Sequence, residues 1–211
     1  MRYLNGQDFH NCVRTPSEMR FTDRGYPILE PIYDIPDDIE LLGWNYVNSK
    51  KHEMWKWIHF FMEDYLFNSV WNSPDRMMEK LESFSGVLSP DFSMFYDTPY
   101  PIQCYNFYRS MWCGAYWQLN GLKVIPNVCW SDDPSLDFVF ESYPKNSVVA
   151  VSMVGCTKDP IGRGIFLRGY DRMLQELNPS KILLLASDAQ RKMVDGPIQH
   201  IRYSFMKERE E

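Results

Sequence analysis

A predicted buried strand near the middle of the chain is followed at once by hydroxyl and carboxylate side chains, in the stretch GVLSPDFSMFYDTP (residues 86–99). After the apolar residues Gly86, Val87 and Leu88, the polar residues Ser89, Asp91 and Ser93 fall on alternate positions. A carboxylate at the end of a buried strand can act as a general base, a nucleophile or a ligand of a divalent cation such as Mg²⁺. The same residues also suit a turn, in which proline removes a backbone donor and Asp91 caps the next segment. The sequence leaves both interpretations open.

A second group of polar side chains lies along one face of the helix predicted to follow. Gln103, Asn106 and Arg109 are three residues apart, which places them close together on the helix surface. The guanidinium of Arg109 suits either an ion pair with Asp91 or Asp97, or recognition of an anionic or planar ligand group. The sequence does not choose between these two roles.

Further candidate residues lie at the ends of later predicted elements. Gln118 follows two aromatic residues and is a candidate to read the edge of a ligand stacked on them. Trp130 ends a predicted strand and is a candidate to line a pocket, while Ser152 ends the next strand. Asp132 could share a proton or Mg²⁺ with Asp91, although its motif, SDDPS, equally suits an ordinary helix N-terminus.

Motifs for phosphate, zinc and nucleophilic cysteine are weak. GCTKDPIGRG (155–164) carries Lys158 and Arg163 before a predicted helix and could hold one phosphate, but it matches neither the P-loop nor the dinucleotide-binding spacing. The four histidines lack zinc-ligand spacing, so no metal site is predicted. The five cysteines include no C-x-x-C pair and are expected to be reduced thiols.

The elements that must position these residues alternate between strand and helix from residue 86 onward. Predicted strands cover 86–93, 123–130, 147–155, 181–187 and 198–205, and predicted helices cover 100–121, 131–142, 160–178 and 188–196. This alternation predicts an α/β fold with a mostly parallel sheet of four to five strands and flanking helices, either open and doubly wound or a part-barrel.

The N-terminal part of the chain precedes these units and is expected to belong to the same single domain, residues 1–211. Residues 1–50 contain four prolines and no sustained period, so we expect an irregular segment wrapped on the body of the domain. Residues 51–85 are predicted to be helical, with an amphipathic helix over 51–70 and a shorter helix that begins with Ser73 and Pro74.

The predicted parallel sheet brings the candidate residues together. Ligands of open parallel sheets bind beyond the carboxyl ends of the strands. Four predicted strands end in hydroxyl, carboxylate, aromatic or glycine residues, which we expect to share one rim: Ser89, Asp91, Ser93, Trp130, Ser131, Asp132, Asp133, Ser152, Gly155, Ser187 and Asp188.

Composition limits the class of protein. The chain of 211 residues is 45% hydrophobic and 16% aromatic, so it can bury a substantial core. A net charge of −6 gives no sign of a basic nucleic-acid-binding face, although a local basic groove is not excluded. No apolar run is long enough for a membrane span and no signal peptide is recognisable, so we expect a cytoplasmic protein without membrane contact.

Seven stretches within residues 55–187 match one known family when taken together: FNSVWNSP (67–74), GVLSPDFS (86–93), QCYNFYRS (103–110), GAYWQLNG (114–121), VIPNVCWS (124–131), SVVAVSMVG (147–155) and FLRGY (166–170). Through them the chain resembles the domain-of-unknown-function 4417 family of bacteria, phages and mobile elements. The family has no established activity, so the resemblance implies a context and no mechanism. Its members often end the fourth strand in Tyr-Gly, where this chain has Ala186-Ser187.

Two classes of function fit these observations. The first is an enzyme that binds a nucleotide-like or phosphorylated ligand at the sheet edge, with Asp91 as acid, base or metal-holding group, Arg109 as anion clamp, and Trp130 and Asp132 beside them. The second is a non-catalytic protein that binds a host or phage protein through its aromatic residues and the acidic stretch 30–42. Nucleic-acid binding without catalysis stays a third alternative.

Overall fold

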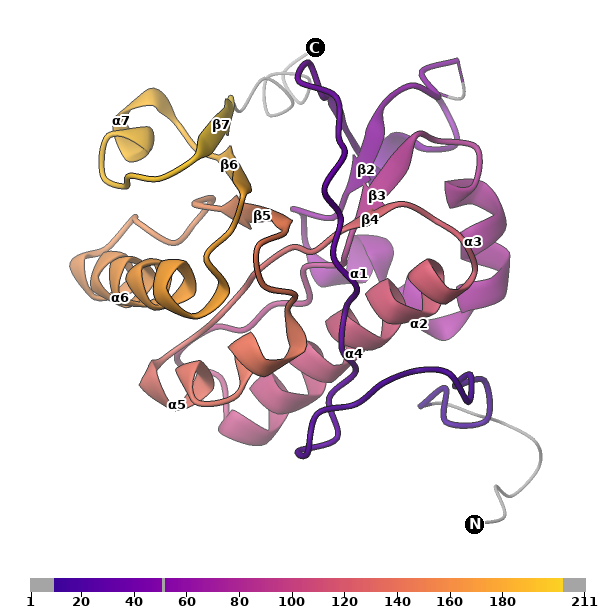
Figure 1. Ribbon diagram of the computed structural model, residues 1–211, viewed down its shortest axis with the longest axis horizontal. Coiled ribbons are helices and arrows are strands. Elements are labelled where there is room, and N and C mark those ends of the chain that lie inside the picture. Colours follow the sequence, from indigo (N-terminus) through magenta and orange to yellow (C-terminus); the bar gives the residue numbers. More distant parts are fainter. Residues whose placement is uncertain (1–9, 51, 203–211) are drawn as a thin grey trace.

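Seven short parallel strands run through residues 10–50 and 52–202, which are the residues that the computed structural model describes (Figure 1). In chain order they are β1 (Leu41–Gly43), β2 (Trp57–His59), β3 (Gly86–Leu88), β4 (Val124–Ile125), β5 (Val148–Ser152), β6 (Lys181–Leu185) and β7 (Ile198–Ile201). The first four form one sheet in that order and the last three form another, and all neighbours are parallel. The predicted α/β fold with a mostly parallel sheet is confirmed.

The two sheets are joined through the residues that follow β4. The backbone N–H of Val128 donates to the carbonyl of Ala150 at 2.8 Å, and the N–H of Ala150 donates to the carbonyl of Pro126 at 2.8 Å. The strands therefore follow one another in chain order across both sheets. A doubly wound sheet reverses its strand order at a switch point, so this sequential order agrees with the part-barrel form of the prediction.

Helices cover the outer face of the strands. They are α1 (Asp64–Phe67), α2 (Ser69–Asn72), α3 (Pro74–Leu81), α4 (Tyr100–Leu119), α5 (Asp133–Leu136), α6 (Pro160–Leu177) and α7 (Asp188–Arg191), with the 3₁₀ helices η2 (Trp44–Tyr46) and η3 (Val139–Ser142). Trp117 of α4 and Met173 of α6 belong to one apolar core with Ile58, Val87 and Leu184, which face outward from their strands. Within the described residues, no helix has the length and apolar character needed to cross a membrane.

The amphipathic helix predicted over residues 51–70 is wrong for its central part. Residues 57–59 form β2, paired with β1 on one side and β3 on the other, and only the short α1 and α2 follow. Trp57 faces the inner apolar cluster while Ile58 faces the outer core. A strand buried on both faces is apolar at every position, so its pattern resembles a broad helical face. β1 likewise lies within the segment predicted to be irregular.

A second, smaller apolar cluster fills the inner side of the part-barrel, from the first residues of β2 and β5 to the last residues of β3 and β4. Ile35 and Ile39 of the N-terminal segment pack there against one or two side chains from each of several strands: Trp57, Leu88, Ile125, Val148, Ala150 and Leu183. The N–H of Val148 donates to the carbonyl of Ile32 at 2.9 Å, which ties the segment to β5. Figure 1 shows this indigo segment running between the two sheets. The inner side is thus closed at its amino end.

Candidate functional site

A cavity of about 1120 Å³ opens at the opposite end, where the carboxyl ends of the strands meet. Residues that end or follow six of the strands line it, including Gly43, His59, Phe61, Asp91, Ser93, Asn127, Trp130, Ser131, Ser152, Gly155 and Ser187. Of the predicted rim, Ser89, Asp132, Asp133 and Asp188 do not line the cavity. The strand ends of the part-barrel therefore converge on one hollow, as expected for parallel strands.

Asp91 lies on the wall of this cavity and is partly exposed to it. Its Oδ1 accepts a hydrogen bond from Nδ2 of Asn127 at 3.0 Å. Burial among protein atoms raises the pKa of Asp91 to about 6; the hydrogen bond from Asn127 opposes this rise, and the nearby charge of Asp64 adds to it. The carboxyl group can therefore exchange a proton close to neutral pH.

Asn127 is the partner of Asp91, and its role is not evident from sequence reasoning alone. Its side chain is 1% exposed, its N–H donates to Oγ of Ser89 at 2.8 Å, and its carbonyl accepts from the hydroxyl of Tyr143 at 2.9 Å. Its Oδ1 is buried and has no hydrogen-bond partner within the described chain. A lone amide in the apolar run VIPNVC is the signal that could have pointed to it.

Arg109 does not form the ion pair with Asp91 or Asp97 that the sequence suggested. Its guanidinium donates to Oδ1 of Asn68 at 3.0 Å and to Oδ1 of Asn106 at 2.6 Å, and lies 3.9 Å from a carboxylate oxygen of Asp64. The same group sits 3.8 Å from the centre of the Phe92 ring. Arg109 is outside the cavity lining, because its partners come from α1, from the residue between α1 and α2, and from α4, and they hold it behind the wall.

The Arg109 network fixes the segment that follows Asp91. Asp64 accepts hydrogen bonds from the backbone N–H of Ser93 at 3.1 Å and from its hydroxyl at 2.8 Å. Asn106 donates to the carbonyl of Ser93 at 2.6 Å. Sequence reasoning missed Asp64, because residues 64 and 93 are far apart in the chain. Two of the three residues predicted on this face of α4, Asn106 and Arg109, therefore support the cavity wall from behind.

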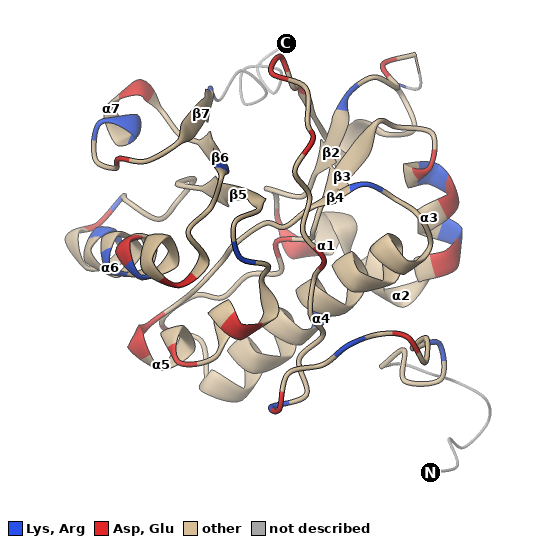
Figure 2. Ribbon diagram, viewed as in Figure 1, with Lys and Arg blue, Asp and Glu red and all other residues tan. Residues whose placement is uncertain are grey.

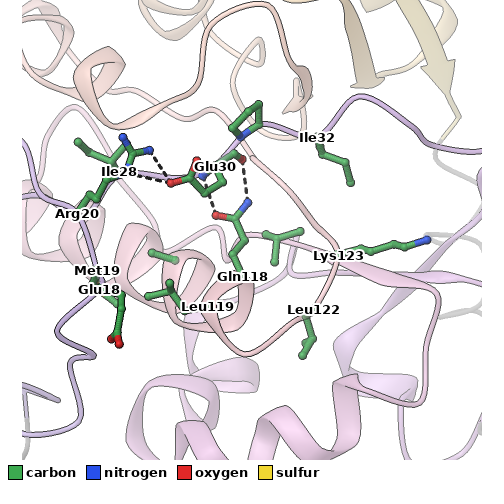
Figure 3. A pocket seen from close by; sticks show the side chains of 13 residues that line it. Glu18, Met19, Arg20, Ile28, Glu30, Ile32, Gln118, Leu119, Leu122 and Lys123 are labelled. Atoms are coloured by element: carbon green, nitrogen blue, oxygen red, sulfur yellow. Dashed lines mark hydrogen bonds and ion pairs between the residues drawn. The ribbon is translucent and has the colours of Figure 1, made fainter.

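Three other predicted residues lie away from the cavity. Gln103 donates to the carbonyl of Thr98 at 2.9 Å and closes the start of α4. Gln118 binds the backbone N–H and carbonyl of Glu30, both at 2.8 Å, beside a smaller hollow of about 310 Å³ (Figure 3). Asp132 stands just before α5, outside the lining. Their proposed contact with a ligand finds no geometric support.

Trp130 and Ser152 do line the cavity. The indole of Trp130 rests on Gly169 of α6, where a Cβ atom would collide with it, and its ring centre is 5.2 Å from that of Phe166. The hydroxyl of Ser152 accepts a hydrogen bond from the N–H of Val154 at 3.1 Å. Trp130 is thereby held as part of an aromatic wall.

The glycine-rich loop before α6 also borders the cavity, through Lys158, Asp159 and Gly162. The side chain of Asp159 accepts a hydrogen bond from the N–H of Gly162 at 2.8 Å and caps the helix. A carboxylate of the chain itself therefore occupies the position that a phosphate would take at this helix N-terminus.

The cavity lining offers neither a reactive thiolate nor a clear metal site. Burial raises the pKa of the Cys156 thiol to about 12, and burial also raises the pKa of Cys129, so both stay protonated near neutral pH. Across the residues that the structure describes, no group of three or more histidine, cysteine or acidic side chains is arranged to hold a metal ion. The suggested Mg²⁺ thus gains no ligand set.

The model of one protein family, described as Domain of unknown function (DUF4417), matches residues 22–203. The chain belongs to the domain-of-unknown-function 4417 family. The resemblance expected over residues 55–187 is therefore confirmed, and the match extends further at both ends.

Two phage proteins are similar to this member of the family. The Gene 1 protein of Mycobacterium phage D29 is 34% identical over 160 residues, which cover 72% of this chain and 59% of the phage protein. The Gene 1 protein of Mycobacterium phage L5 is 34% identical over 179 residues, which cover 81% and 77%. The chain thus spans less than two thirds of the D29 protein. No solved structure matches it.

Proposed function

We propose that this member of the domain-of-unknown-function 4417 family is an enzyme that binds a nucleotide-like small molecule in the large cavity. Asp91 is its acid–base group. The observation that carries the proposal is the Asp91–Asn127 pair on the wall of a roomy, partly aromatic hollow at the carboxyl ends of parallel strands. Active sites of barrels built from parallel strands occupy this end of the fold.

The surroundings of Asp91 suit proton transfer. A general acid or base works best when its pKa lies near the working pH, and the pKa of Asp91 is raised to about 6. The carboxyl group is also held firmly, because Asn127 is anchored to Ser89 and the segment after Asp91 is anchored to Asp64 through Ser93. Such a rigid setting is what catalysis by a positioned side chain requires.

The shape and lining of the cavity favour a planar ligand of nucleoside size. A volume of about 1120 Å³ accommodates such a molecule, and aromatic rings from several elements provide stacking surfaces: Tyr46, Phe61, Phe95, Tyr96, Trp130 and Phe166. Figure 2 shows acidic and basic residues interspersed on α3 and α6, and the net charge is −6. These charges favour a small molecule over a nucleic-acid strand.

In this proposal Arg109 is a positioning residue and not an anion clamp, since it lies outside the cavity lining and reaches the segment after Asp91 through Asp64, Asn106 and the ring of Phe92. The similarity to mycobacteriophage proteins supports the further proposal that the protein acts in the cytoplasm of an infected bacterial cell.

The test compares the full chain with Asp91→Asn and with Asp97→Asn, a matched change at an exposed residue outside the cavity. Native mass spectrometry of the purified proteins and NMR of added nucleosides and nucleoside monophosphates measure binding and conversion. We expect the wild type and Asp97→Asn to bind and convert one of these compounds, and Asp91→Asn to lose conversion. The proposal fails if none of the compounds binds the wild type, or if Asp91→Asn converts as fast as Asp97→Asn. A stoichiometric protein partner without a small molecule would support the non-catalytic alternative.

A further inference from the structure

We infer that the cavity recognises its ligand through adjacent N–H donors on a planar ring, as on the edge of guanine, and that Asp91 and Asn127 read this edge. The inference rests on the proposed function and narrows the class of ligand. It starts from the hydrogen-bonding capacity that these two side chains have left once they have bound each other.

Both residues line the cavity, and each keeps an acceptor oxygen that no described residue satisfies. An ionised carboxylate can only accept hydrogen bonds, so Asn127 must turn its Nδ2 toward Oδ1 of Asp91, where it lies at 3.0 Å. The carbonyl oxygen of the Asn127 side chain is then left buried and without a hydrogen-bond partner in the described part of the chain. Among the described residues, Asp91 receives one hydrogen bond, from Asn127, which leaves its second oxygen to accept another. A ligand that satisfies both groups must bring donors.

The backbone that carries these two side chains is held in place. The backbone of Asn127 is held on both sides, by Oγ of Ser89 at 2.8 Å and by the hydroxyl of Tyr143 at 2.9 Å. The segment after Asp91 is held by the hydrogen bonds between Ser93 and Asp64. A fixed pair of acceptors discriminates strongly, because a ligand that lacks the matching donor leaves a buried polar group unpaired.

The charges around the cavity also favour an uncharged ring over a phosphorylated ligand. Its lining includes the acidic residues Glu63, Asp91 and Asp159, and Lys158 is the one lysine or arginine among the described lining residues. Burial lowers the pKa of His59 to about 3, so this histidine adds no positive charge at neutral pH. The net negative charge of the lining would repel a polyphosphate, whereas it would not repel an uncharged nucleoside or base.

Guanine fits this combination, since N1–H and the 2-amino group are neighbouring donors on a planar, uncharged ring. Adenine places one acceptor beside one donor on the corresponding edge, and hypoxanthine lacks the 2-amino group. A series of nucleosides therefore separates the contribution of each donor without a change in ring size or sugar.

The experiment is isothermal titration calorimetry of the full chain at pH 8 with guanosine, inosine and adenosine. We expect guanosine to bind about tenfold more tightly than inosine or better, because the 2-amino group donates to a charged acceptor. Adenosine is expected to bind more weakly than either. In Asp91→Asn the affinity for guanosine should exceed that for inosine by less than about threefold, because the charged acceptor is gone. Asp97→Asn should keep the wild-type ratio of the two affinities.

Inosine serves as the control for folding, since its binding to Asp91→Asn shows an intact cavity. The inference would be overturned if the wild type bound adenosine as tightly as guanosine or more tightly. It would also be overturned if Asp91→Asn kept the wild-type ratio of guanosine affinity to inosine affinity. If other nucleosides bind and respond to Asp91→Asn but guanosine is not preferred, this inference fails and the proposed function stands. If no nucleoside or nucleoside monophosphate binds the wild type, both fail.

Discussion

The two ends of the same parallel strands are filled in opposite ways. At the amino ends of β2 and β5, Ile35 and Ile39 of the N-terminal segment pack against Trp57 and Val148 in a closed apolar cluster. At the carboxyl ends, a cavity of about 1120 Å³ is bordered by carboxylate, amide and hydroxyl groups and by aromatic rings, with Asp91 on its wall. One strand can serve both ends: β2 begins with Trp57 and ends with the cavity-lining His59.

This difference separates stability from chemistry along the length of each strand. Apolar side chains at the closed end stabilise the fold through burial, and any space there would be a defect. At the open end the chain keeps a carboxylate with a raised pKa and a buried amide oxygen that no described residue satisfies, and both features cost stability. Substitutions at the two ends should therefore have effects of different size and of different sign.

The largest effect is expected at the closed end, for Trp57→Ala. The side chain is 2% exposed and lies over Gly86 of β3, where a Cβ atom would collide with the indole. Its removal should lower the free energy of unfolding by about 3–5 kcal/mol, measured by urea denaturation. Trp55→Ala, at a residue that is 58% exposed, is the control and should change it by less than about 0.5 kcal/mol. Similar losses for the two variants would contradict the closed inner cluster.

Arg109→Ala tests the support behind the cavity wall. The side chain is 12% exposed, and its loss removes the cation beside Asp64 and the donor to the Oδ1 atoms of Asn68 and Asn106. We expect a loss of about 3 kcal/mol in the free energy of unfolding, since the remaining groups stay partly buried. Arg163→Ala, at an exposed residue of α6, should cost less than about 0.5 kcal/mol. A urea midpoint for Arg109→Ala equal to that of the wild type would show that the network is not structural.

Asp91→Asn should stabilise the protein, and the gain should depend on pH. The carboxyl group ionises near pH 3.8 in the unfolded chain and near pH 6 in the folded protein. Between these values the folded state binds more protons, so wild-type stability falls as pH rises through this window. The variant lacks this loss, so its free energy of unfolding relative to that of the wild type should rise by about 2 kcal/mol as pH increases from 4 to 7.

Chemical denaturation at pH 4 and pH 7 measures the free energy of unfolding of the wild type and of Asp91→Asn. The titrations of all other groups are common to both proteins, so they cancel when the two values are subtracted. Asp97→Asn controls for the change of side chain. A stability difference between Asp91→Asn and the wild type that is the same at both pH values would refute the raised pKa of Asp91.

The smallest effect is expected for Ser187→Ala, at the open end. Ser187 caps α7 by accepting from the N–H of Gln190 at 3.2 Å, while the side chain of Gln190 accepts from the N–H of Ser187 at 2.9 Å. Loss of this capping box should cost about 1 kcal/mol in thermal or urea unfolding. Ser180→Ala, at an exposed residue before β6, provides the matched control. A cost of several kcal/mol would mean that this hydroxyl supports more of the cavity wall than α7.

Elements with a strong local pattern could be predicted from the sequence. The helix predicted over 100–121 is α4, over 100–119, and the helix predicted over 160–178 is α6, over 160–177. β1 and β2 were missed because they have only three residues each and are mostly buried, so neither shows a period of two.

In the candidate site, too, the residue with a local sequence pattern could be predicted, and its distant partners could not. Asp91 could be predicted, since a carboxylate directly after a buried strand is a local pattern. Its partner Asn127 is 36 residues away, and the partner of Arg109, Asp64, is 45 residues away. Such pairings depend on which strands and helices become neighbours, and no local pattern encodes them.

The sequence by itself determined that parallel strands end in polar residues and that these ends share one edge, because chain direction alone brings the carboxyl ends of parallel strands together. Only the tertiary structure decided which side chains meet there. Hydrogen bonds require two groups within about 3 Å, and that distance is set by which strands pair and by how the helices pack against them. The pairing of β3 with β4 placed Asn127 beside Asp91, and the packing of α1 beside α4 turned Arg109 away from the cavity toward Asp64.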